Sequence, residues 1–406
     1  MARSDVIFRA GRWNELPRHI ILVVFSHLPL RDRFSASLAC KLWSSCFNSP
    51  VLWKEIIFRL EKAEDAQRCL VSVDKYGGIL RNLRIDLNPK DSINCTNASR
   101  VLTNLARCKE RSLERVSINF TEGNPLFFRG VDILCSLAEL FGPPDPKIRF
   151  SSFLKVLDLS EMAIAFDDKL INLLSGNHQH LEVMNMQNKS LTCRVTPECM
   201  EVFVRKCRKL KVLITFYKCL SEQVLFAMTE TGREPMQFLS VLCKMEEKYH
   251  RGITNEAWSV IGCKLPDLKV AIHFDYTTDR DQIRKILLPM IPLAELDIRS
   301  LSDVHQEVHL AGKYYHNSLE SVTISTTHSD QLEESFVYLA AHSTKLRMLH
   351  SFCGLHKSTI QSIREFRPEL QKYTLQENDT EDCSLPLIFQ GRFAQVERMK
   401  ELGMYG

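Results

Sequence analysis

The sequence predicts an α/β protein: a segment of three helices at the N-terminus, followed by a solenoid of strand–helix repeats. In the solenoid we expect parallel strands on the concave side and helices on the convex side. Three observations predict this fold. Apolar residues crowd the first helical segment, one apolar spacing recurs eleven times from residue 80 onward, and the gaps between those repeats show helical periodicity.

Composition fits a folded protein without a membrane or nucleic-acid signature. The 406 residues are 45% apolar and 25% charged, which is typical of globular chains. The net charge of +4 permits an acidic partner but does not predict nucleic-acid binding. No apolar run approaches the roughly 18 residues of a membrane span, and the first residues lack the apolar core of a signal peptide. We therefore expect a cytoplasmic or nuclear protein that contacts no membrane.

The sequence contains no motif that predicts catalysis or metal binding. Its 14 cysteines are scattered and form no CxxC pair, so we expect buried thiols in a reducing compartment. GxSxG, P-loop, GxGxxG and HExxH motifs are absent. His178 and His180 are interpreted as loop residues. We therefore expect no catalytic residues, no metal site, no cofactor and no enzyme activity.

The N-terminal segment, residues 12–56, is predicted to contain three short helices. Pro17 suits the first turn of a helix that runs through His27, before Pro29. Further helices are expected over 31–39 and 41–47. The apolar residues of the first helix surround its axis, and so small a segment cannot bury them all. The segment is therefore predicted to be one side of an interface.

The same segment contains Leu16-Pro17, Phe25-Ser26-His27-Leu28, Asp32, Cys40, Trp43 and Leu52-Trp53 in this order. With these residues it resembles an F-box. The family pattern is Leu-Pro, an apolar helix ending in Phe-Ser-x-Leu, an Asp at the next helix start, then Cys, Trp and a closing Leu-Trp. One departure is that Arg18-His19 replaces the acidic residue usual after Leu-Pro, which puts one polar contact in doubt.

The resemblance implies docking on the Skp adaptor and, through it, on the cullin and RING subunits of a ubiquitin ligase. Trp53 is expected either at this interface or against the first repeat. The alternative is a helical cap of the solenoid with no outside partner. The predicted adaptor-binding residues are Leu16, Pro17, Ile20, Leu28, Leu38, Cys40, Trp43 and Leu52.

From residue 80 onward, apolar residues recur with the spacing LxxLxL or a close variant. Successive units begin 24 to 41 residues apart, and seven of the ten intervals lie between 24 and 29. The three longer intervals, after Leu80, Leu113 and Met236, predict insertions. The units begin at Leu80, Leu113, Leu154, Leu181, Leu210, Met236, Leu268, Leu293, Leu319, Leu346 and Leu370.

This period resembles that of leucine-rich repeats, in which three apolar side chains of each strand face the interior. Helical patterns occupy the gaps, for example over 197–207, 281–291 and 358–366. Most units lack the consensus Asn past the strand, so irregular turns are expected. The alternative is an all-helical solenoid, against which the β-branched strand residues argue. We assign 57–79 to a helical linker, 80–380 to the solenoid and 381–406 to a C-terminal cap or tail.

The combined resemblance implies the substrate-recognition subunit of a Skp–cullin–F-box ubiquitin ligase, whose repeats hold an unidentified target protein. A narrower resemblance, over 257–300, is to the F-box only protein thirty-three and thirty-nine subgroup. The predicted target contacts lie between the core positions of the strands. They are Arg84, Glu114, Asp158, Glu182, Asp297 and Glu320.

Two other functions remain open from the sequence. One is a protein-binding scaffold without ubiquitin transfer. The other is an RNA-binding repeat protein, which the basic residues between 205 and 211 would serve. The sequence favours a simpler interpretation of these residues, as the solvated end of a convex helix leading into the next strand.

Overall fold

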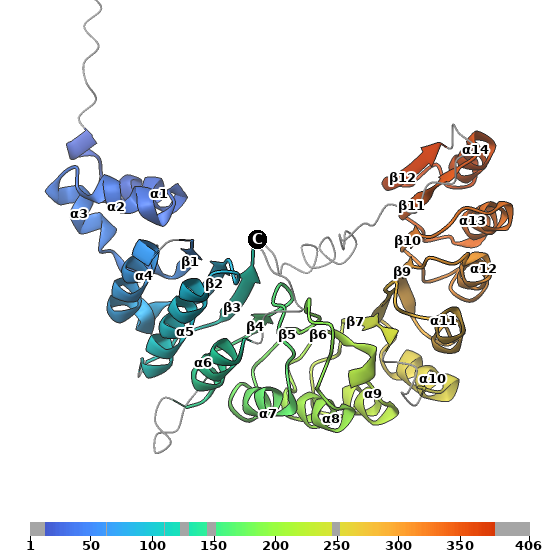
Figure 1. Ribbon diagram of the computed structural model, residues 1–406, viewed down its shortest axis with the longest axis horizontal. Helices are drawn as coiled ribbons and strands as arrows, with labels where there is room; N and C mark the ends of the chain where they lie inside the picture. Colours follow the sequence, from blue (N-terminus) through green and yellow to red (C-terminus); the bar gives the residue numbers. More distant parts are fainter. Residues whose placement is uncertain are drawn as a thin grey trace, which may run out of the picture.

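The computed structural model describes residues 13–61, 63–108, 110–121, 130–143, 152–245 and 252–377. These residues form a curved solenoid with strands along its inner side and helices along its outer side (Figure 1). The N-terminal helices sit at one end of the arc and the last repeat at the other. The predicted cap or tail over 381–406 lies outside the described residues. None of the described helices combines the length and apolarity needed to cross a bilayer.

The N-terminal segment contains the three predicted helices, with boundaries within two residues of those expected. Pro17 and Pro29 stand immediately before the first and second helices, where a missing N–H leaves no hydrogen bond unmade. Short 3-10 turns flank the helices. The elements are η1 (Trp13–Glu15), α1 (Arg18–His27), α2 (Leu30–Ser37), α3 (Lys41–Phe47) and η2 (Pro50–Trp53).

The described part of the chain contains one parallel sheet of twelve strands in chain order. All eleven predicted units form strands, β2 to β12, and this sheet rules out an all-helical solenoid. The strands are β1 (Glu55–Leu60), β2 (Asn82–Leu87), β3 (Arg115–Phe120), β4 (Val156–Asp158), β5 (Val183–Asn185), β6 (Val212–Phe216), β7 (Phe238–Cys243), β8 (Lys269–Phe274), β9 (Leu293–Arg299), β10 (Ser321–Ser325), β11 (Met348–Leu355) and β12 (Lys372–Glu377).

The first strand corrects the predicted linker. Residues 57–60 belong to β1, which pairs with β2 over six residues, so a helix alone over 57–79 was wrong. The strand alternates exposed and buried side chains, with Ile56, Phe58 and Leu60 facing the core. Because the sheet begins two residues after Trp53, the first repeat follows the N-terminal helices without a spacer.

Helices on the convex side return the chain from one strand to the next. Several start at Ser, Thr or Asp side chains that accept a backbone N–H of the first turn, as at Thr196, Ser221, Thr254 and Ser329. The helices and 3-10 turns of the repeats are α4 (Ala63–Tyr76), η3 (Gly77–Ile79), α5 (Ser92–Arg107), α6 (Val131–Phe141), α7 (Asp168–Asn177), α8 (Pro197–Lys206), η4 (Tyr217–Cys219), α9 (Glu222–Met228), α10 (Asn255–Lys264), α11 (Arg280–Ile286), α12 (His305–Tyr314), α13 (Asp330–His342) and α14 (Lys357–Phe366).

Two of the three predicted helix patterns match closely, and the third is shorter than expected. Helices α8 and α14 cover their predicted ranges to within one residue, whereas α11 ends at Ile286 instead of continuing to residue 291. The insertion after Leu113 contains helix α6. The long interval after Leu80 is filled by α5, which has 16 residues.

The hydrophobic core lies between the strands and the convex helices, and it runs without a break from Ile21 to Ile363. The apolar positions of the LxxLxL spacing form the side of the core that belongs to the sheet. Leu210 and Leu213, for example, are fully buried. The N-terminal helices contribute Ile21, Phe25 and Cys46 to the same core. No repeat buries its apolar face alone, because each depends on the repeats beside it.

Side chains other than the consensus Asn connect the turns of neighbouring repeats. Thr278 donates its hydroxyl to the Cys243 carbonyl at 3.0 Å, and Thr326 donates to the Ser302 carbonyl at 2.6 Å. Asn188 donates its amide N–H to the Ile164 carbonyl. Each of these hydrogen bonds joins one repeat to the repeat before it, so repeats without the consensus residue still stack.

The core predicts a matched pair of stability effects. We expect Leu213→Ala to lower the free energy of unfolding by about 2 to 5 kcal/mol, because it leaves a cavity between strand and helix. Leu191 is 55% exposed, and Leu191→Ala should change stability by less than about 0.5 kcal/mol. Chemical denaturation followed by circular dichroism measures both; equal losses would contradict the described core.

Candidate protein-binding surfaces

Helix α1 divides its apolar residues between the interior and the solvent. Ile21 and Phe25, four residues apart, are buried in the core. Ile20, Val23 and Val24 lie on the opposite side and are 37 to 56% exposed. Three β-branched side chains at this spacing form an apolar stripe on the surface. The predicted excess of apolar surface is therefore present.

Helix α2 and the following turn add to this apolar surface. Phe34 and Leu38, four residues apart, are 50% and 72% exposed, and Val51 in η2 is exposed as well. We call Ile20, Val23, Val24, Phe34, Leu38 and Val51 the N-terminal apolar surface. The sequence pattern predicted Ile20 and Leu38 at an interface but not the other four, although the spacing of Val23, Val24 and Phe34 along α1 and α2 is visible in the sequence.

The structure separates the eight predicted adaptor-binding residues into three groups. Pro17, Ile20 and Leu38 are exposed. Leu52, by contrast, is only 4% exposed and packs in the core, so it supports the surface from inside. Four residues are partly buried, and these are Leu16, Leu28, Cys40 and Trp43.

Arg33 joins the three parts of the N-terminal segment. Its guanidinium donates to the carbonyls of Leu28 at 2.7 Å, Leu52 at 2.9 Å and Ser26 at 3.1 Å. Burial lowers the pKa of Arg33 from its ordinary value, and the nearby Glu55 opposes this shift. One side chain thus ties the end of α1 to η2, which fixes the relative position of the exposed apolar residues.

The N-terminal segment is joined to the first repeat by stacked aromatic rings. Trp53 stacks on Tyr76 of α4, with 3.9 Å between ring centroids and 11° between planes. The Trp53 indole N–H donates to the Phe47 carbonyl at 2.7 Å. Tyr76 and Lys75 both donate to the side-chain oxygen of Asn48. Trp53 therefore packs against the first repeat, the second of the two positions expected for it.

The six predicted target contacts do not meet at one place. Arg84 and Asp158 lie in one row of the sheet through Ser117, whereas Asp297 lies in another row with Thr323. Several of the charges are engaged inside the chain. Arg84 pairs with Asp86, Glu114 with Arg81 and Lys155, Glu182 with Lys211, and Glu320 with Lys269.

Asp297 belongs to a buried charged group on the inner face of the sheet. Its carboxylate contacts Arg299 at 2.8 Å and His273 Nδ1 at 3.6 Å. Burial alone would raise the pKa of Asp297, but the neighbouring His273 and Arg299 outweigh burial and hold it below its usual range. Asp297 is therefore a charged, internally neutralised residue.

The centre of the inner face is apolar, which the sequence analysis missed. In the strand register, Val156 lies beside Val183, Val183 beside Val212, and Val212 beside Phe238. The next row on the same face of the sheet contains Ile214 and Ala271. We call these six residues the concave apolar cluster; five of them are at most 2% exposed. The signal was available, because β6 (VLITF) and β7 (FLSVLC) are almost continuously apolar instead of alternating.

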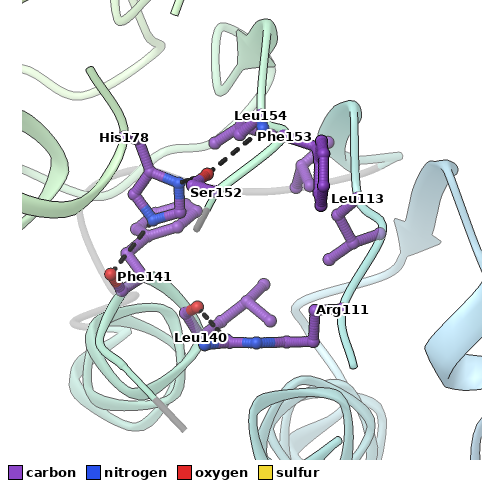
Figure 2. A pocket seen from close by; sticks show the side chains of 9 residues that line it. Arg111, Leu113, Leu140, Phe141, Ser152, Phe153, Leu154 and His178 are labelled. Atoms are coloured by element: carbon purple, nitrogen blue, oxygen red, sulfur yellow. Dashed lines mark hydrogen bonds between the residues drawn. The ribbon is translucent and has the colours of Figure 1, made fainter. Parts of the chain in front are cut away.

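A small cavity lies at the C-terminal end of α6 (Figure 2). Its volume is about 20 Å³, which is room for a water molecule and not for a substrate. Arg111 donates to the Leu140 and Gly142 carbonyls, and His178 Nε2 donates to the Phe141 carbonyl at 3.0 Å. The Ser152 hydroxyl donates to His178 Nδ1. These side chains thus occupy carbonyls that a helix end leaves unsatisfied.

The expectation that His178 is a loop residue was incomplete, because it caps α7 and is buried. Burial lowers the pKa of His178 to about 4, and the Phe141 carbonyl partly opposes this shift. The imidazole is therefore neutral at pH 7, with one nitrogen donating and the other accepting. Burial also lowers the pKa of Arg111, to about 10, which leaves it charged.

A wider groove of about 660 Å³ lies on the helical side, between α12 and α13. Its lining includes the stacked rings of His309 and Tyr338, with Arg284 and Glu334 at other positions. Size alone would admit a small ligand. The serine of the lining, Ser335, donates its hydroxyl to the Gln331 carbonyl at 2.8 Å.

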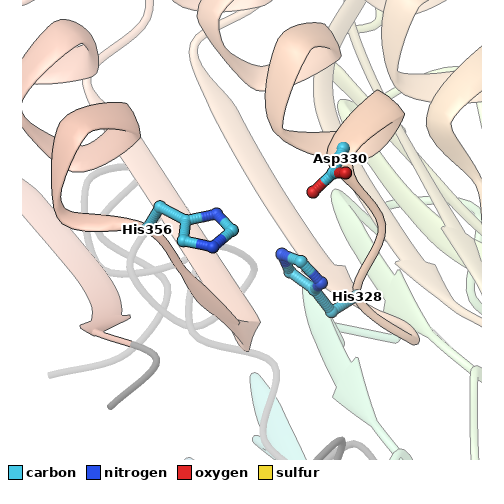
Figure 3. Close-up of side chains that lie close together, drawn as sticks. All are labelled: His328, Asp330 and His356. Atoms are coloured by element: carbon cyan, nitrogen blue, oxygen red, sulfur yellow. The ribbon is translucent and has the colours of Figure 1, made fainter. Parts of the chain in front are cut away.

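His328, Asp330 and His356 have ligand atoms within 4.8 Å of one another, close enough to hold a metal ion (Figure 3). The structure also gives the two histidines another partner, Glu333. Its carboxylate accepts from His328 Nε2 at 2.9 Å, from His356 Nδ1 at 3.0 Å and from the Thr359 hydroxyl. Burial would raise the pKa of Glu333, but these hydrogen bonds outweigh burial and lower it. The cluster therefore has a structural role without an ion, as a tie between the last two described repeats.

The cysteines in the described ranges are free thiols, and burial deactivates at least two of them. No disulfide forms among them, and burial raises the pKa of Cys199 and of Cys207 to about 12. A thiol with so high a pKa is protonated at pH 7 and is a poor nucleophile.

The basic residues between 205 and 211 are partly neutralised inside the chain. Arg205 pairs with Glu201 and Glu230, and Lys211 pairs with Glu182.

Comparison with known proteins supports both halves of the fold. The F-box-like family model matches residues 13–59. Human F-box/LRR-repeat protein 8 is 25% identical over 89% of this chain and 94% of its own length. Mouse F-box/LRR-repeat protein 21 is 22% identical over 64% of this chain and 59% of its own. Human F-box only protein 33 is 23% identical over 86% of this chain and 73% of its own.

These comparisons show an F-box-like segment and homology to F-box proteins that carry leucine-rich repeats. Together with the twelve-stranded parallel sheet, they confirm the predicted leucine-rich-repeat solenoid behind an F-box. The narrower likeness to the F-box only protein thirty-three and thirty-nine subgroup stays a prediction.

Arg33 predicts a local stability effect. We expect Arg33→Ala to cost about 2 to 3 kcal/mol, because it leaves carbonyls without their charged donor. Arg33→Lys should recover little of this lost stability, since one lysine ammonium cannot reproduce the planar guanidinium that donates to three carbonyls. Hydrogen exchange of residues 18–47 measures the effect, with Arg31→Ala on the exposed part of α2 as the control. Equal protection in the Arg33 and Arg31 variants would contradict the role of Arg33.

His178 predicts a dependence of stability on pH. Its folded pKa is depressed, so its contribution is fully present above about pH 6.5 and is lost as pH falls from there through about 4. We expect the wild type to lose at least about 1 kcal/mol more than His178→Gln between pH 7 and pH 5. Denaturant titrations at the two pH values measure this. His180→Gln, at an exposed site, should behave as the wild type.

Proposed function

We propose that this protein is the substrate-recognition subunit of a Skp–cullin–F-box ubiquitin ligase. The observation that carries the proposal is the N-terminal apolar surface, on a segment that matches the F-box-like model. Large apolar side chains at 37 to 72% exposure are costly in water and dominate the binding energy of interfaces. An adaptor that covers them would remove that cost.

The adaptor interface in this proposal combines predicted residues with those that the structure adds. Pro17, Ile20 and Leu38 are at its centre, and Val23, Val24, Phe34 and Val51 extend it. Leu16, Leu28, Cys40 and Trp43 form its partly buried edge, whereas Leu52 acts from the core. Through the adaptor, the cullin and RING subunits would join the complex.

The solenoid would hold the target at a fixed distance from the ubiquitin-carrying enzyme. The stacking of Trp53 on Tyr76 supports this, because it leaves no flexible spacer between docking segment and repeats. The chain would contribute proximity and orientation, while bond chemistry would belong to the partner enzymes. A cytoplasmic or nuclear location is part of the proposal.

Target contact is proposed for the inner face of the sheet. Of the six predicted residues, Arg84 is the most accessible, with a side chain about half exposed. Asp297 and Glu320 are buried in internal pairs and would have to exchange partners to meet a target. Their participation therefore carries a larger desolvation cost than that of Arg84.

Two alternative functions, a protein-binding scaffold and an RNA-binding protein, can be distinguished from the proposed one. A scaffold without ubiquitin transfer would use the same repeats but would bind no adaptor. RNA binding has less support, because Arg205 and Lys211 already pair with acidic side chains. Membership of the F-box only protein thirty-three and thirty-nine subgroup is likewise proposed on the likeness over 257–300.

Adaptor binding tests the proposal directly. We expect Val24→Asp and Leu38→Asp each to weaken binding of purified Skp adaptor at least tenfold, which corresponds to about 1.4 kcal/mol. A carboxylate placed on an apolar contact must be desolvated, which is the reason for the loss. Calorimetric titration of the full chain with adaptor measures the affinities.

Val71→Asp is the matched control, since Val71 on α4 is 57% exposed but lies outside the N-terminal segment. Its affinity for the adaptor should equal that of the wild type. A wild-type chain that ignores the adaptor, or a Val71 effect as large as the other two, would refute the proposal and favour the scaffold.

A further inference from the structure

The turns after β10 and β11 bring two histidines and an aspartate together. His328 and Asp330 follow β10, and His356 follows β11, the next strand of the sheet. Parallel neighbours end at the same edge of a sheet, so the two turns are adjacent. Both imidazoles and the carboxylate face a common space (Figure 3), and one ligand atom of each lies within 4.8 Å of the other two.

A helix cap holds the two ligands of the first turn. Ser329 is the N-cap of α13, and its hydroxyl accepts from the Leu332 backbone N–H at 3.0 Å. The same hydroxyl donates to Asp303 of the preceding repeat at 3.0 Å. His328 and Asp330 flank Ser329, so these hydrogen bonds limit how far the two residues can move apart.

Glu333 orients both imidazoles as a carboxylate orients histidines that bind a metal. It accepts from His328 Nε2 at 2.9 Å, from His356 Nδ1 at 3.0 Å and from the His356 backbone N–H at 2.8 Å. In metal sites, a histidine commonly donates to a carboxylate through the nitrogen that does not bind the ion. A neutral imidazole that donates through one nitrogen has a lone pair on the other. Each ring therefore keeps one nitrogen for an ion.

We propose that His328, Asp330 and His356 bind a zinc ion, with a fourth position open to water. Two imidazoles and one carboxylate are a ligand set of zinc sites that keep an open position. Magnesium and calcium take oxygen ligands, so the two histidines argue against them. The carboxylates of Asp330 and Glu333 would also balance the charge of a divalent cation.

The ligand atoms lie near the separation that zinc requires. Zinc–ligand distances of about 2.0 to 2.2 Å place tetrahedral nitrogen and oxygen ligands about 3.4 Å apart. The observed limit of 4.8 Å exceeds this separation by about 1.4 Å. Asp330 and His356 are exposed, so rotation of their side chains can supply a movement of this size, and an ion can enter from the solvent.

The ion would join two repeats. His328 and Asp330 precede and begin α13, whereas His356 is the N-cap of α14 in the next repeat. Glu333 already ties these repeats by hydrogen bonds, and the ion would add a second tie. The sequence predicted no metal site because the ligands form no short motif, with His356 lying 26 residues after Asp330. The proposal does not depend on adaptor binding.

Calorimetric titration of the metal-free full chain with Zn²⁺, under reducing conditions, tests the proposal. We expect a dissociation constant of about 10 µM or tighter for the wild type. Asp330→Asn and His356→Gln should each weaken binding at least tenfold, because each removes a ligand. Asp330→Asn leaves the hydrogen bonds of Glu333 in place, so its effect does not come from a lost tie between the repeats.

His342→Gln is the matched control, since His342 is an exposed histidine of α13 outside the cluster. It should bind Zn²⁺ as the wild type does. Four results would each overturn the proposal: wild-type binding weaker than about 100 µM, unchanged affinity in either ligand variant, an equal loss in His342→Gln, or equally tight binding of Mg²⁺.

Cobalt spectroscopy separates this site from binding by the 14 cysteines of the chain. Co²⁺ on nitrogen and oxygen ligands gives visible d–d bands without the near-ultraviolet charge-transfer band of a thiolate ligand. We expect this spectrum in the wild type and in His342→Gln, and its loss in His356→Gln. A thiolate band that persists in His356→Gln would place the ion on cysteines and overturn the proposal. Adaptor affinity is measured without added metal, so failure of the proposed function and failure of this inference give different results.

Discussion

No repeat of this chain can bury its own apolar face, and the rest of the structure depends on that constraint. Each strand places its motif residues against helices of its own and neighbouring repeats. The result is one core from Ile21 to Ile363 under an unbroken ladder of twelve strands. Because Ile21 and Phe25 belong to that core, the N-terminal segment is the first layer of the array and not an appended module. Its orientation is therefore set by packing.

The same constraint distinguishes the two apolar surfaces outside this core. Residues such as Val23 and Leu38 are exposed, so their cover must come from another molecule or be missing. Residues such as Ile214 and Phe238, on the concave side, are buried. Both surfaces are apolar, yet only the first is free for a partner. This difference is the reason for proposing an adaptor contact at the first surface only.

Polar side chains maintain the array where the repeat consensus fails. Thr278, Thr326 and Asn188 donate to carbonyls of the preceding repeat, and Arg111 and His178 donate to the end of α6. A buried carbonyl needs a donor but does not require a particular residue type. Sequence divergence in the turns is therefore compatible with regular stacking, since several chemistries meet the same requirement.

The sequence by itself determined the strand–helix order, the eleven units from Leu80 to Leu370 and the three N-terminal helices. Such features depend on spacing and on capping residues within one element, which a local pattern records. Only the tertiary structure decided that residues 55–60 form a strand, since EIIFRL lacks the leading Leu and needs β2 beside it. It also decided that Leu52 is buried, that Arg33 reaches the Leu52 carbonyl, and that His178 reaches that of Phe141, 37 residues away. These contacts join residues distant along the chain, and their energy depends on packing that no local spacing encodes.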